Sequence, residues 1–197
     1  MTYRDRCESN FTDSSDLNSN QEEADTKLIL HTADASVSGA TDLDIFADDT
    51  DVLVLAIRRV KMFNCHTRFI RKSRTIEINL LQFNLGDDLS TALPAFHAIS
   101  GADITGSFSR KGKLSCWTAL LECPKTVLKA FQQLGTTHEI ADDVIAGIEK
   151  YVCKLYSLKT DVTKLEDLRW MFKHTQKTFH RRRQHWCKPF AERITSY

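Results

Sequence analysis

The segment Leu43-Asp-Ile-Phe-Ala-Asp-Asp-Thr-Asp-Val-Leu-Val-Leu-Ala-Ile57 places an acidic turn between two stretches that contain most of its apolar side chains. Residues 43–47 predict a short β-strand. Residues 52–57 form a continuous apolar run, which is typical of a strand that a parallel sheet buries on both faces. Carboxylates close to a core repel one another unless a proton or a cation intervenes. We therefore expect an α/β fold with an acidic site beside the sheet, at Asp48, Asp49 and Asp51.

The composition indicates a folded protein without a dominant charge. The chain has 197 residues, 42% of them hydrophobic, with 11 Phe and 3 Trp, which is enough for a core in one domain. Its 27 basic and 26 acidic residues leave a net charge of +1, so no overall field indicates a nucleic-acid or membrane partner.

The cysteines and the apolar segments bear on the location of the protein. The six cysteines contain no Cys-x-x-Cys pair, and the amino end has no secretory apolar segment. We therefore expect reduced thiols in an intracellular protein, nuclear or cytoplasmic rather than secreted. No apolar run approaches the length of a membrane span, so no membrane partner is expected.

The chain divides into three predicted regions. Residues 1–20 are rich in Ser, Asn and Asp and predict a disordered amino-terminal stub. Residues 21–173 predict a folded domain that is α/β in its first half and helical in its second. Residues 174–197 form a basic and aromatic tail. A strand or hairpin is expected over residues 68–78. The predicted helices cover residues 22–36, 79–85, 88–100, 111–122, 124–134, 139–157 and 163–172.

Further carboxylates flank two of the predicted helices. Glu23 and Asp25 begin the helix 22–36, and Asp103 follows the helix 88–100. Polar groups at the carboxyl ends of parallel strands converge on one crevice, so these residues are candidates to join Asp49 and Asp51 there. Clustered carboxylates suit Mg²⁺ or Mn²⁺, and two such ions activate water against a phosphodiester. The alternative is that they are charges favoured by helix dipoles and residues of solvated turns.

The order of these acidic motifs resembles the flap-endonuclease group of the PIN-like nucleases. The matching motifs are Glu23-Ala-Asp25, Asp49-Thr-Asp51 and Gly101-Ala-Asp103. In that group an acidic pair opens a helix, a second Asp pair follows a strand, and a Gly-x-Asp ends a helix. The resemblance covers residues 20–173. It implies a PIN-like, three-layer α/β core with a parallel sheet over residues 22–80, and a Mg²⁺- or Mn²⁺-dependent 5′ nuclease activity. It implies that Asp49, Asp51 and Asp103 are catalytic, and that all three hold metal together with Glu23 and Asp25.

Four segments are more closely similar to dispersed, uncharacterised animal proteins of mobile-element type. They are Glu22-Glu-Ala-Asp-Thr26, Asp49-Thr-Asp-Val52, Leu93-Pro-Ala-Phe-His97 and Leu168-Arg-Trp-Met-Phe172. The chain departs from the family because no strand with ligand aspartates precedes the Glu-x-Asp helix. We therefore expect a core that is incomplete at the amino end and a site that is partial or inactive. His97 is expected to be a packed, hydrogen-bonded core histidine.

Two basic segments predict contacts to nucleic acid, DNA rather than RNA. Residues 104–113 occupy the place of the family's helix-hairpin-helix turn, which implies a helical second half with backbone contacts from Arg110, Lys111, Gly112 and Lys113. In the tail, Arg181, Arg182 and Arg183 lie among aromatic residues, which suits single-stranded nucleic acid or a nuclear import signal. The tail histidines and Cys187 do not have zinc-ligand spacing.

Three function classes remain open at this point. The first is a metal-dependent nuclease, and the second is a non-catalytic remnant that still binds nucleic acid. The third is a protein-interaction fragment with neither activity. The alternative for the basic turn is an ordinary solvated turn.

Overall fold

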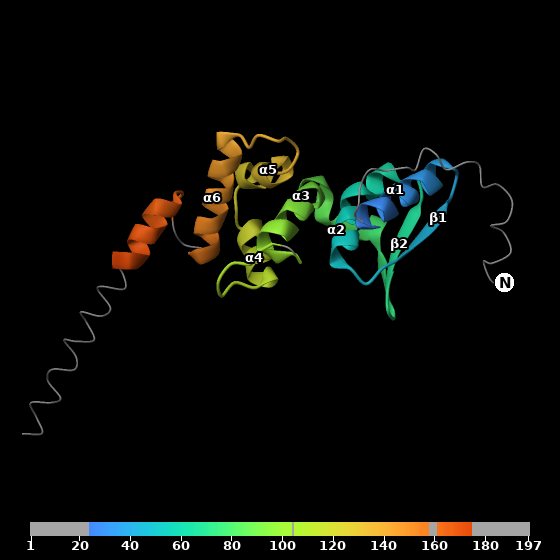
Figure 1. The fold of residues 1–197 in the computed structure, drawn as a ribbon, viewed down its shortest axis with the longest axis horizontal. Helices are drawn as coiled ribbons and strands as arrows, with labels where there is room; N and C mark the ends of the chain where they lie inside the picture. Colours follow the sequence, from blue (N-terminus) through green and yellow to red (C-terminus); the bar gives the residue numbers. More distant parts are fainter. Residues whose placement is uncertain (1–23, 104, 158–160, 175–197) are drawn as a thin grey trace, which may run out of the picture. The chain divides into compact units, whose positions relative to one another are not determined.

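The computed structural model describes residues 24–103, 105–157 and 161–174, and it is a mostly helical α/β fold (Figure 1). The predicted stub 1–20, Glu23 and residues 175–197 of the tail lie outside the described residues.

The chain forms two compact units, Met1–Ala98 and Ile99–Tyr197. The elements in chain order are α1 (Ala24–Val37), β1 (Asp42–Phe46), α2 (Thr50–Arg59), the 3-10 helix η3 (Val60–Met62), β2 (His66–Arg71), β3 (Arg74–Glu77), α3 (Ile78–Gly101), α4 (Lys113–Leu121), α5 (Lys125–Gln133) and α6 (Asp142–Tyr156). A further helical segment covers residues 165–174.

The first unit contains a three-stranded sheet in the order β1-β2-β3. β1 pairs with β2 in parallel, with Ile45 opposite Phe69, and α2 lies in the connection between the two strands. β2 pairs with β3 in antiparallel, with Phe69 opposite Ile76, through the two-residue turn that contains Lys72 at φ 50°. The hairpin prediction over residues 68–78 is confirmed. The sheet is mixed, so the predicted parallel core holds for one of its two strand pairs.

Helices cover one face of this sheet. Ile45 and Phe69 lie in a buried cluster with Ile29 of α1, Val52 of α2 and Ile78 of α3. Because successive side chains of a strand point to opposite faces, the residues between them face away from that cluster. On β1 these are the exposed residues 42, 44 and 46. Over residues 24–98 the structure therefore has two layers, where the resemblance implies three.

The apolar run 52–57 belongs to helix α2 and not to a strand, which corrects the prediction from the sequence. Val52, Ala56 and Ile57 are buried in the core cluster, and α2 also contacts α1. A helix that is covered on several sides has no polar stripe, so its sequence resembles that of a buried strand. Two features distinguish it as a helix: Asp49, which caps its amino end, and the basic pair Arg58 and Arg59 in its last turn.

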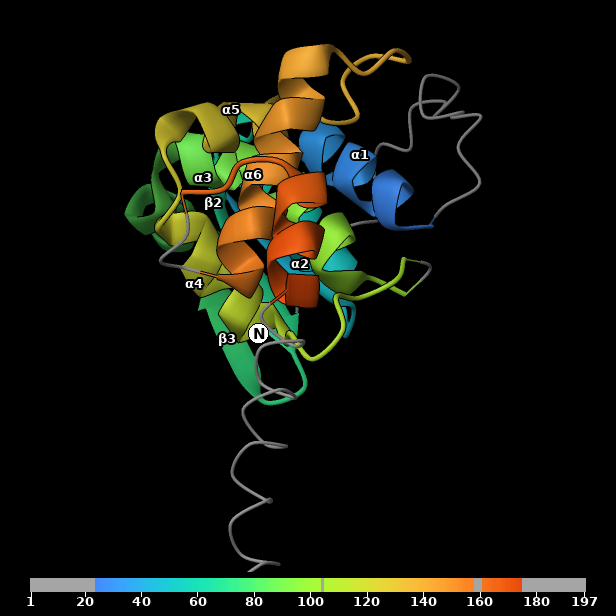
Figure 2. The ribbon, with the colours of Figure 1, turned by 90° about the vertical axis from the view of Figure 1, so that its left-hand side faces the viewer.

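The second unit packs α4, α5 and α6 around an aromatic centre. Figures 1 and 2 show α5 beside α6, and the two helices are in contact. The Tyr151 ring lies edge-on to Phe131, with 4.9 Å between ring centroids, and its hydroxyl donates to the carbonyl of Cys116 at 3.2 Å. Burial raises the pKa of Tyr151 well above its ordinary value. The predicted helices of this half are confirmed, with bounds that differ by up to three residues.

The helix α3 contains one break. Its backbone leaves helical geometry at Gly86, where φ is 75° and ψ is 169°. A positive φ of this kind costs glycine little and other residues more. The break divides α3 at the boundary expected between the predicted helices 79–85 and 88–100.

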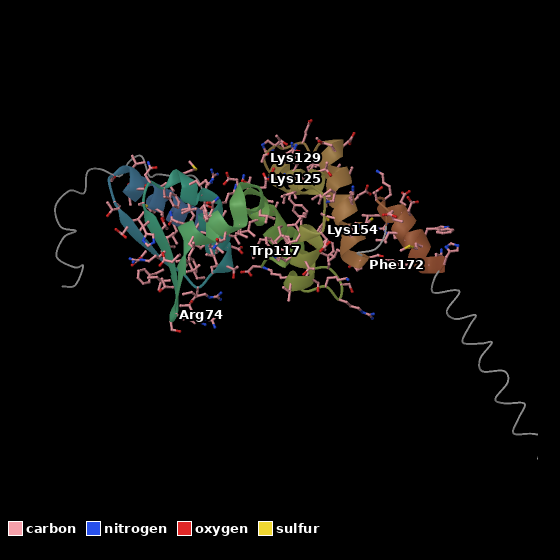
Figure 3. All side chains as sticks on the ribbon, turned by 180° about the vertical axis from the view of Figure 1, so that it is seen from behind. Arg74, Trp117, Lys125, Lys129, Lys154 and Phe172 are labelled. Carbon is pink, nitrogen blue, oxygen red and sulfur yellow. The ribbon has the colours of Figure 1, made fainter. Side chains whose placement is uncertain are left out.

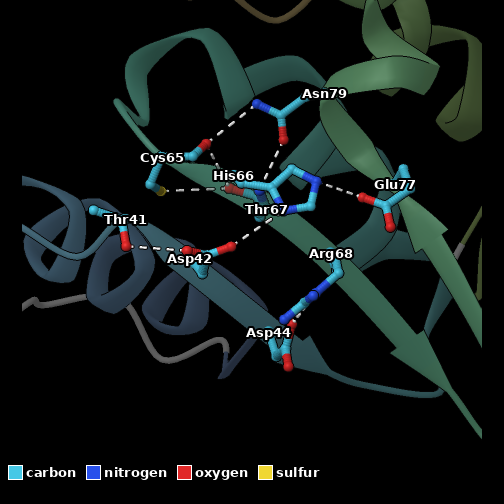
Figure 4. A network of polar contacts seen from close by, with 9 residues as sticks. All are labelled: Thr41, Asp42, Asp44, Cys65, His66, Thr67, Arg68, Glu77 and Asn79. Atoms are coloured by element: carbon cyan, nitrogen blue, oxygen red, sulfur yellow. Dashed lines mark hydrogen bonds and ion pairs between the residues drawn. The ribbon is translucent and has the colours of Figure 1, made fainter.

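The exposed face of the sheet carries a network of charged pairs (Figure 4). The two ring nitrogens of His66 lie 3.4 Å from Asp42 and 2.6 Å from Glu77. Two residues further along β2, on the same face of the sheet, Arg68 donates to Asp44 at 2.6 Å. Opposite charges directly across paired strands stabilise a sheet modestly. The network therefore accounts for the polar character of this face without a ligand.

Replacement of Asp42 by asparagine is expected to make the free energy of unfolding fall less steeply as the pH is lowered below about pH 4. Hydrogen bonds from Thr41 and then His66 hold the pKa of Asp42 below its ordinary value. A carboxyl with a lowered folded-state pKa stabilises the fold above about pH 4 and loses that contribution as the pH falls further. Urea denaturation at a series of pH values measures the effect. If Asp42→Asn and the wild type lose the same free energy of unfolding at low pH, these hydrogen bonds do not persist in solution.

Candidate functional site

The acidic turn after β1 begins helix α2. Asp49 is the N-cap residue, with extended backbone angles of φ −84° and ψ 136°. Its Oδ1 accepts a hydrogen bond from the backbone N–H of Asp51 at 2.9 Å. The cap satisfies a backbone donor that has no partner within the helix, so Asp49 has a structural role in addition to any chemical one.

Asp51 is paired with a buried histidine of α3. Its Oδ1 lies 2.6 Å from Nε2 of His97, and the side chains of Asp51 and His97 are 37% and 11% exposed. The prediction of a packed, hydrogen-bonded His97 is confirmed. The sequence did not indicate Asp51 as the partner of His97, because the two residues are 46 positions apart in the chain. Only the packing of α3 beside the start of α2 brings them together.

Three more of the predicted acidic residues belong to the described part of the chain. Asp48 is exposed and lies 3.9 Å from the Arg71 guanidinium. Asp25 is half-buried in the first turn of α1, which starts at the same side of the sheet as the end of β1 (Figure 1). Asp103 is exposed in the turn after α3 and belongs to the second unit, so its approach to Asp49 stays a prediction. Glu23 lies outside the described residues.

The predicted divalent ion needs side chains that can act as its ligands. Within residues 24–103, 105–157 and 161–174, no three His, Cys, Asp or Glu side chains are grouped so that they would hold a metal ion. Asp49 and Asp51 each use Oδ1 within the protein, and in the described part of the chain neither Oδ2 has a partner. Mg²⁺ is commonly held by one or two carboxylates together with water and substrate phosphates. An ion held by Asp49 and Asp51 together with a phosphate therefore stays a prediction, and the two carboxylates alone do not form a two-ion centre.

The basic turn predicted from residues 109–113 is supported by aromatic side chains of the second unit. The Lys111 ammonium lies 5.4 Å from the centre of the Tyr156 ring, and the Tyr156 hydroxyl donates to the carbonyl of Ser109 at 3.4 Å. Phe108 packs edge-on against the rings of Tyr151 and Tyr156. Lys111 and the backbone of Ser109 are thus attached to the aromatic centre of the unit.

Helix α4 begins at this turn without a side-chain cap. Gly112 is the N-cap residue and makes no side-chain capping bond, so no side chain at this position accepts from the first N–H groups of α4. Arg110 is exposed and has a φ of 59°, and Lys113 is the first helical residue. Backbone N–H groups, the helix dipole and nearby cations together favour an anion such as phosphate. The sequence did not indicate Tyr156 as the support, although a tyrosine at the end of a helix was visible in it.

Comparison with known proteins does not test the expected family. The chain matches no protein family, no curated protein and no solved structure. The PIN-like core and the helix-hairpin-helix turn therefore stay predictions. Arg181, Arg182 and Arg183 lie outside the described residues. In the part of the chain that the structure describes, no helix has the length and apolar character needed to cross a bilayer.

Replacement of Asp49 by alanine is expected to lower the free energy of unfolding by about 1 kcal/mol, because an N-cap acceptor is lost. Asparagine is a capping residue of similar quality, so Asp49→Asn is expected to change stability by only a few tenths of that amount, or about 0.3 kcal/mol. Chemical denaturation in the absence of divalent metal gives both values. Equal destabilisation by the two substitutions would show that the negative charge matters and not the capping bond.

Proposed function

We propose that this protein binds the phosphate backbone of nucleic acid through the basic turn of residues 109–113. The observation that carries the proposal is the anchoring of Lys111 and Ser109 by Tyr156, beside the uncapped amino end of α4. A solvated turn without a function has no need of such support. A turn that is held in place loses less conformational entropy when it binds.

The chemistry of the turn favours phosphate without base readout. Arg110 offers a fork of donors that matches two phosphate oxygens, whereas Lys111 and Lys113 act as point charges. Backbone N–H groups and flexible cations contact any sequence equally. The turn occupies the place of the DNA-contacting turn in the flap-endonuclease group, which supports DNA as the first substrate to test. Binding is therefore expected to be independent of sequence and steeply weakened by salt.

Fluorescence anisotropy with labelled single-stranded and duplex DNA of mixed sequence tests this function. We expect saturable binding at low salt, similar affinities for unrelated sequences, and a large loss of affinity as the salt concentration rises. Absence of binding at low salt would overturn the proposal, as would an affinity that does not change with salt.

Metal-dependent cleavage is the second candidate, supported by the position of Asp49 and Asp51 at the amino end of α2. Both carboxylates retain an Oδ2 without a partner in the described part of the chain. A divalent ion, when bound, activates water and polarises a phosphodiester. The roles proposed for Asp103, Asp25 and Glu23 as further ligands depend on their approach to this pair.

Incubation of the protein with labelled flap DNA and Mn²⁺ separates cleavage from binding. If the second candidate is correct, products appear with Mn²⁺ or Mg²⁺ and not with a chelator, and Asp51→Asn abolishes them without abolishing DNA binding. Asp48→Asn is the matched control, because Asp48 is exposed and lies outside the predicted motif. Binding without any product assigns the chain to the non-catalytic class.

A further inference from the structure

The helical segment 165–174 belongs to the second unit and packs within it by one face. Leu168 is buried, and Lys164, just before the segment, pairs with Glu149 of α6 at 3.3 Å. Burial raises the pKa of the Cys153 thiol on α6, and the negative charges of Glu149 and of Asp167 in this segment add to that effect. The segment therefore has an inner face that packs and an outer face that does not.

The outer face carries cations around a large exposed aromatic residue. Arg169, Trp170, Lys173 and His174 are all exposed, and their spacing of three and four residues places them on neighbouring positions of one helix face. Trp170 is 64% exposed. In the described part of the chain, neither Arg169 nor Lys173 is paired with a carboxylate. Glu166 lies three residues before Arg169 and four before Trp170, so it adds one carboxylate at the amino end of this face, whereas Asp167 interacts with Cys153 of α6.

The Trp170 ring is held in a fixed orientation. The imidazole of His174 stacks on it, with 3.9 Å between ring centroids and 27° between ring planes. The imidazole is fixed in turn by a 2.8 Å hydrogen bond between its Nδ1 and the carbonyl of Trp170. One side of the indole is thus covered by a ring of the same helix, and the residue still exposes most of its surface. Such an arrangement loses little side-chain entropy when another flat ring stacks on it.

We propose that this outer face binds single-stranded nucleic acid, with Trp170 stacking on a base and with Arg169 and Lys173 contacting the adjoining phosphates. The inference rests on the proposed function. It adds a second binding surface and specifies that the substrate is single-stranded. An exposed aromatic ring between cations is the combination that unpaired bases and their backbone recognise. A paired duplex buries the faces of its bases in its own stack, so the same ring has much less to contact there.

The charge on this face favours nucleic acid over an apolar partner. An apolar protein surface that covered Trp170 would also cover Arg169 and Lys173, and burial of an unpaired cation is costly. A polyanion with exposed rings satisfies both kinds of side chain at once. A second copy of this chain is the other occupant that the experiment must separate.

Trp170→Ala in the full chain tests the inference by anisotropy with an oligothymidine and with a duplex. Loss of one base-stacking contact is expected to weaken oligothymidine binding about tenfold and duplex binding less than about twofold. Trp170→Phe is expected to restore most of the affinity, because it keeps an aromatic ring. Phe172→Ala is the matched control, since Phe172 is an exposed aromatic residue two positions away and therefore on another side of the helix (Figure 3).

Each outcome decides between the alternatives. Equal losses for oligothymidine and duplex, or a loss as large in Phe172→Ala, would overturn the stacking role. Unchanged binding in Trp170→Ala, with binding still dependent on Arg110, Lys111 and Lys113, overturns this inference and leaves the proposed function standing. Absence of DNA binding by the wild type overturns both. Concentration-dependent self-association that Trp170→Ala abolishes, measured by light scattering, would assign the face to a second copy and overturn the inference.

Discussion

Replacement of Gly147 by valine is expected to lower the free energy of unfolding by about 3 kcal/mol. Gly147 lies on α6 where that helix meets α5, and a Cβ at this position would overlap the Cβ of Ala130. The two helices can approach this closely only because glycine has no side chain there. Valine therefore forces the helices apart at the aromatic centre, where Phe131 and Tyr151 are in contact.

Guanidinium denaturation followed by circular dichroism measures this loss. Ala146→Val is the matched control, since Ala146 is the exposed neighbour on the same helix and also receives a β-branched residue. That control is expected to cost less than about 1 kcal/mol, which is the effect of helix propensity alone. Similar stabilities for Gly147→Val and Ala146→Val would contradict the close packing of α5 on α6. Because domains are stable by only about 5–15 kcal/mol, the valine variant is expected to lose a large share of its stability.

Simultaneous replacement of Arg110, Lys111 and Lys113 by alanine is expected to weaken DNA binding about 100-fold at low salt. The three cations lie together at the amino end of α4, so they approach the same stretch of backbone. Their removal takes away the charges and leaves the backbone N–H groups in place. Anisotropy with single-stranded and duplex DNA measures the loss, and circular dichroism shows whether the fold is retained.

A matched control removes the same charges from other positions. The triple variant of Arg74, Lys125 and Lys129 also replaces one arginine and two lysines, all exposed (Figure 3). It is expected to weaken binding less than about fivefold, through the lower net charge alone. Equal losses in the two triple variants would mean that DNA responds to overall charge and not to the basic turn.

Part of the fold was predictable because local patterns decided it. The glycine at position 86 marks the break in α3, and the alternation around Ile76 marks a strand of the hairpin. The run 52–57 was misread because a helix covered on several sides is as continuously apolar as a buried strand. The aspartate at position 49 was the available signal for a helix start, since a capping residue before an apolar run favours a helix.

The candidate sites depended more on long-range contacts than on sequence spacing. The spacing of Asp49 and Asp51 indicated an acidic site, but it did not indicate that His97 would engage Asp51 from another helix. In the same way, the basic residues of the turn were evident, whereas their support by Tyr156 came only from packing. The face around Trp170 was not identified from the sequence because the predicted helix 163–172 ended before Lys173 and His174, which complete the face.

The salt dependence of single-stranded DNA binding tests the central proposal most directly, because its slope reports how many phosphates the protein neutralises. The measurement is log Kd against log salt concentration for the wild type and for the triple variant of Arg110, Lys111 and Lys113. If these cations contact phosphates, the slope of the variant is smaller by about 2. Equal slopes for the two proteins would contradict the account, because the turn would then contribute no phosphate contacts.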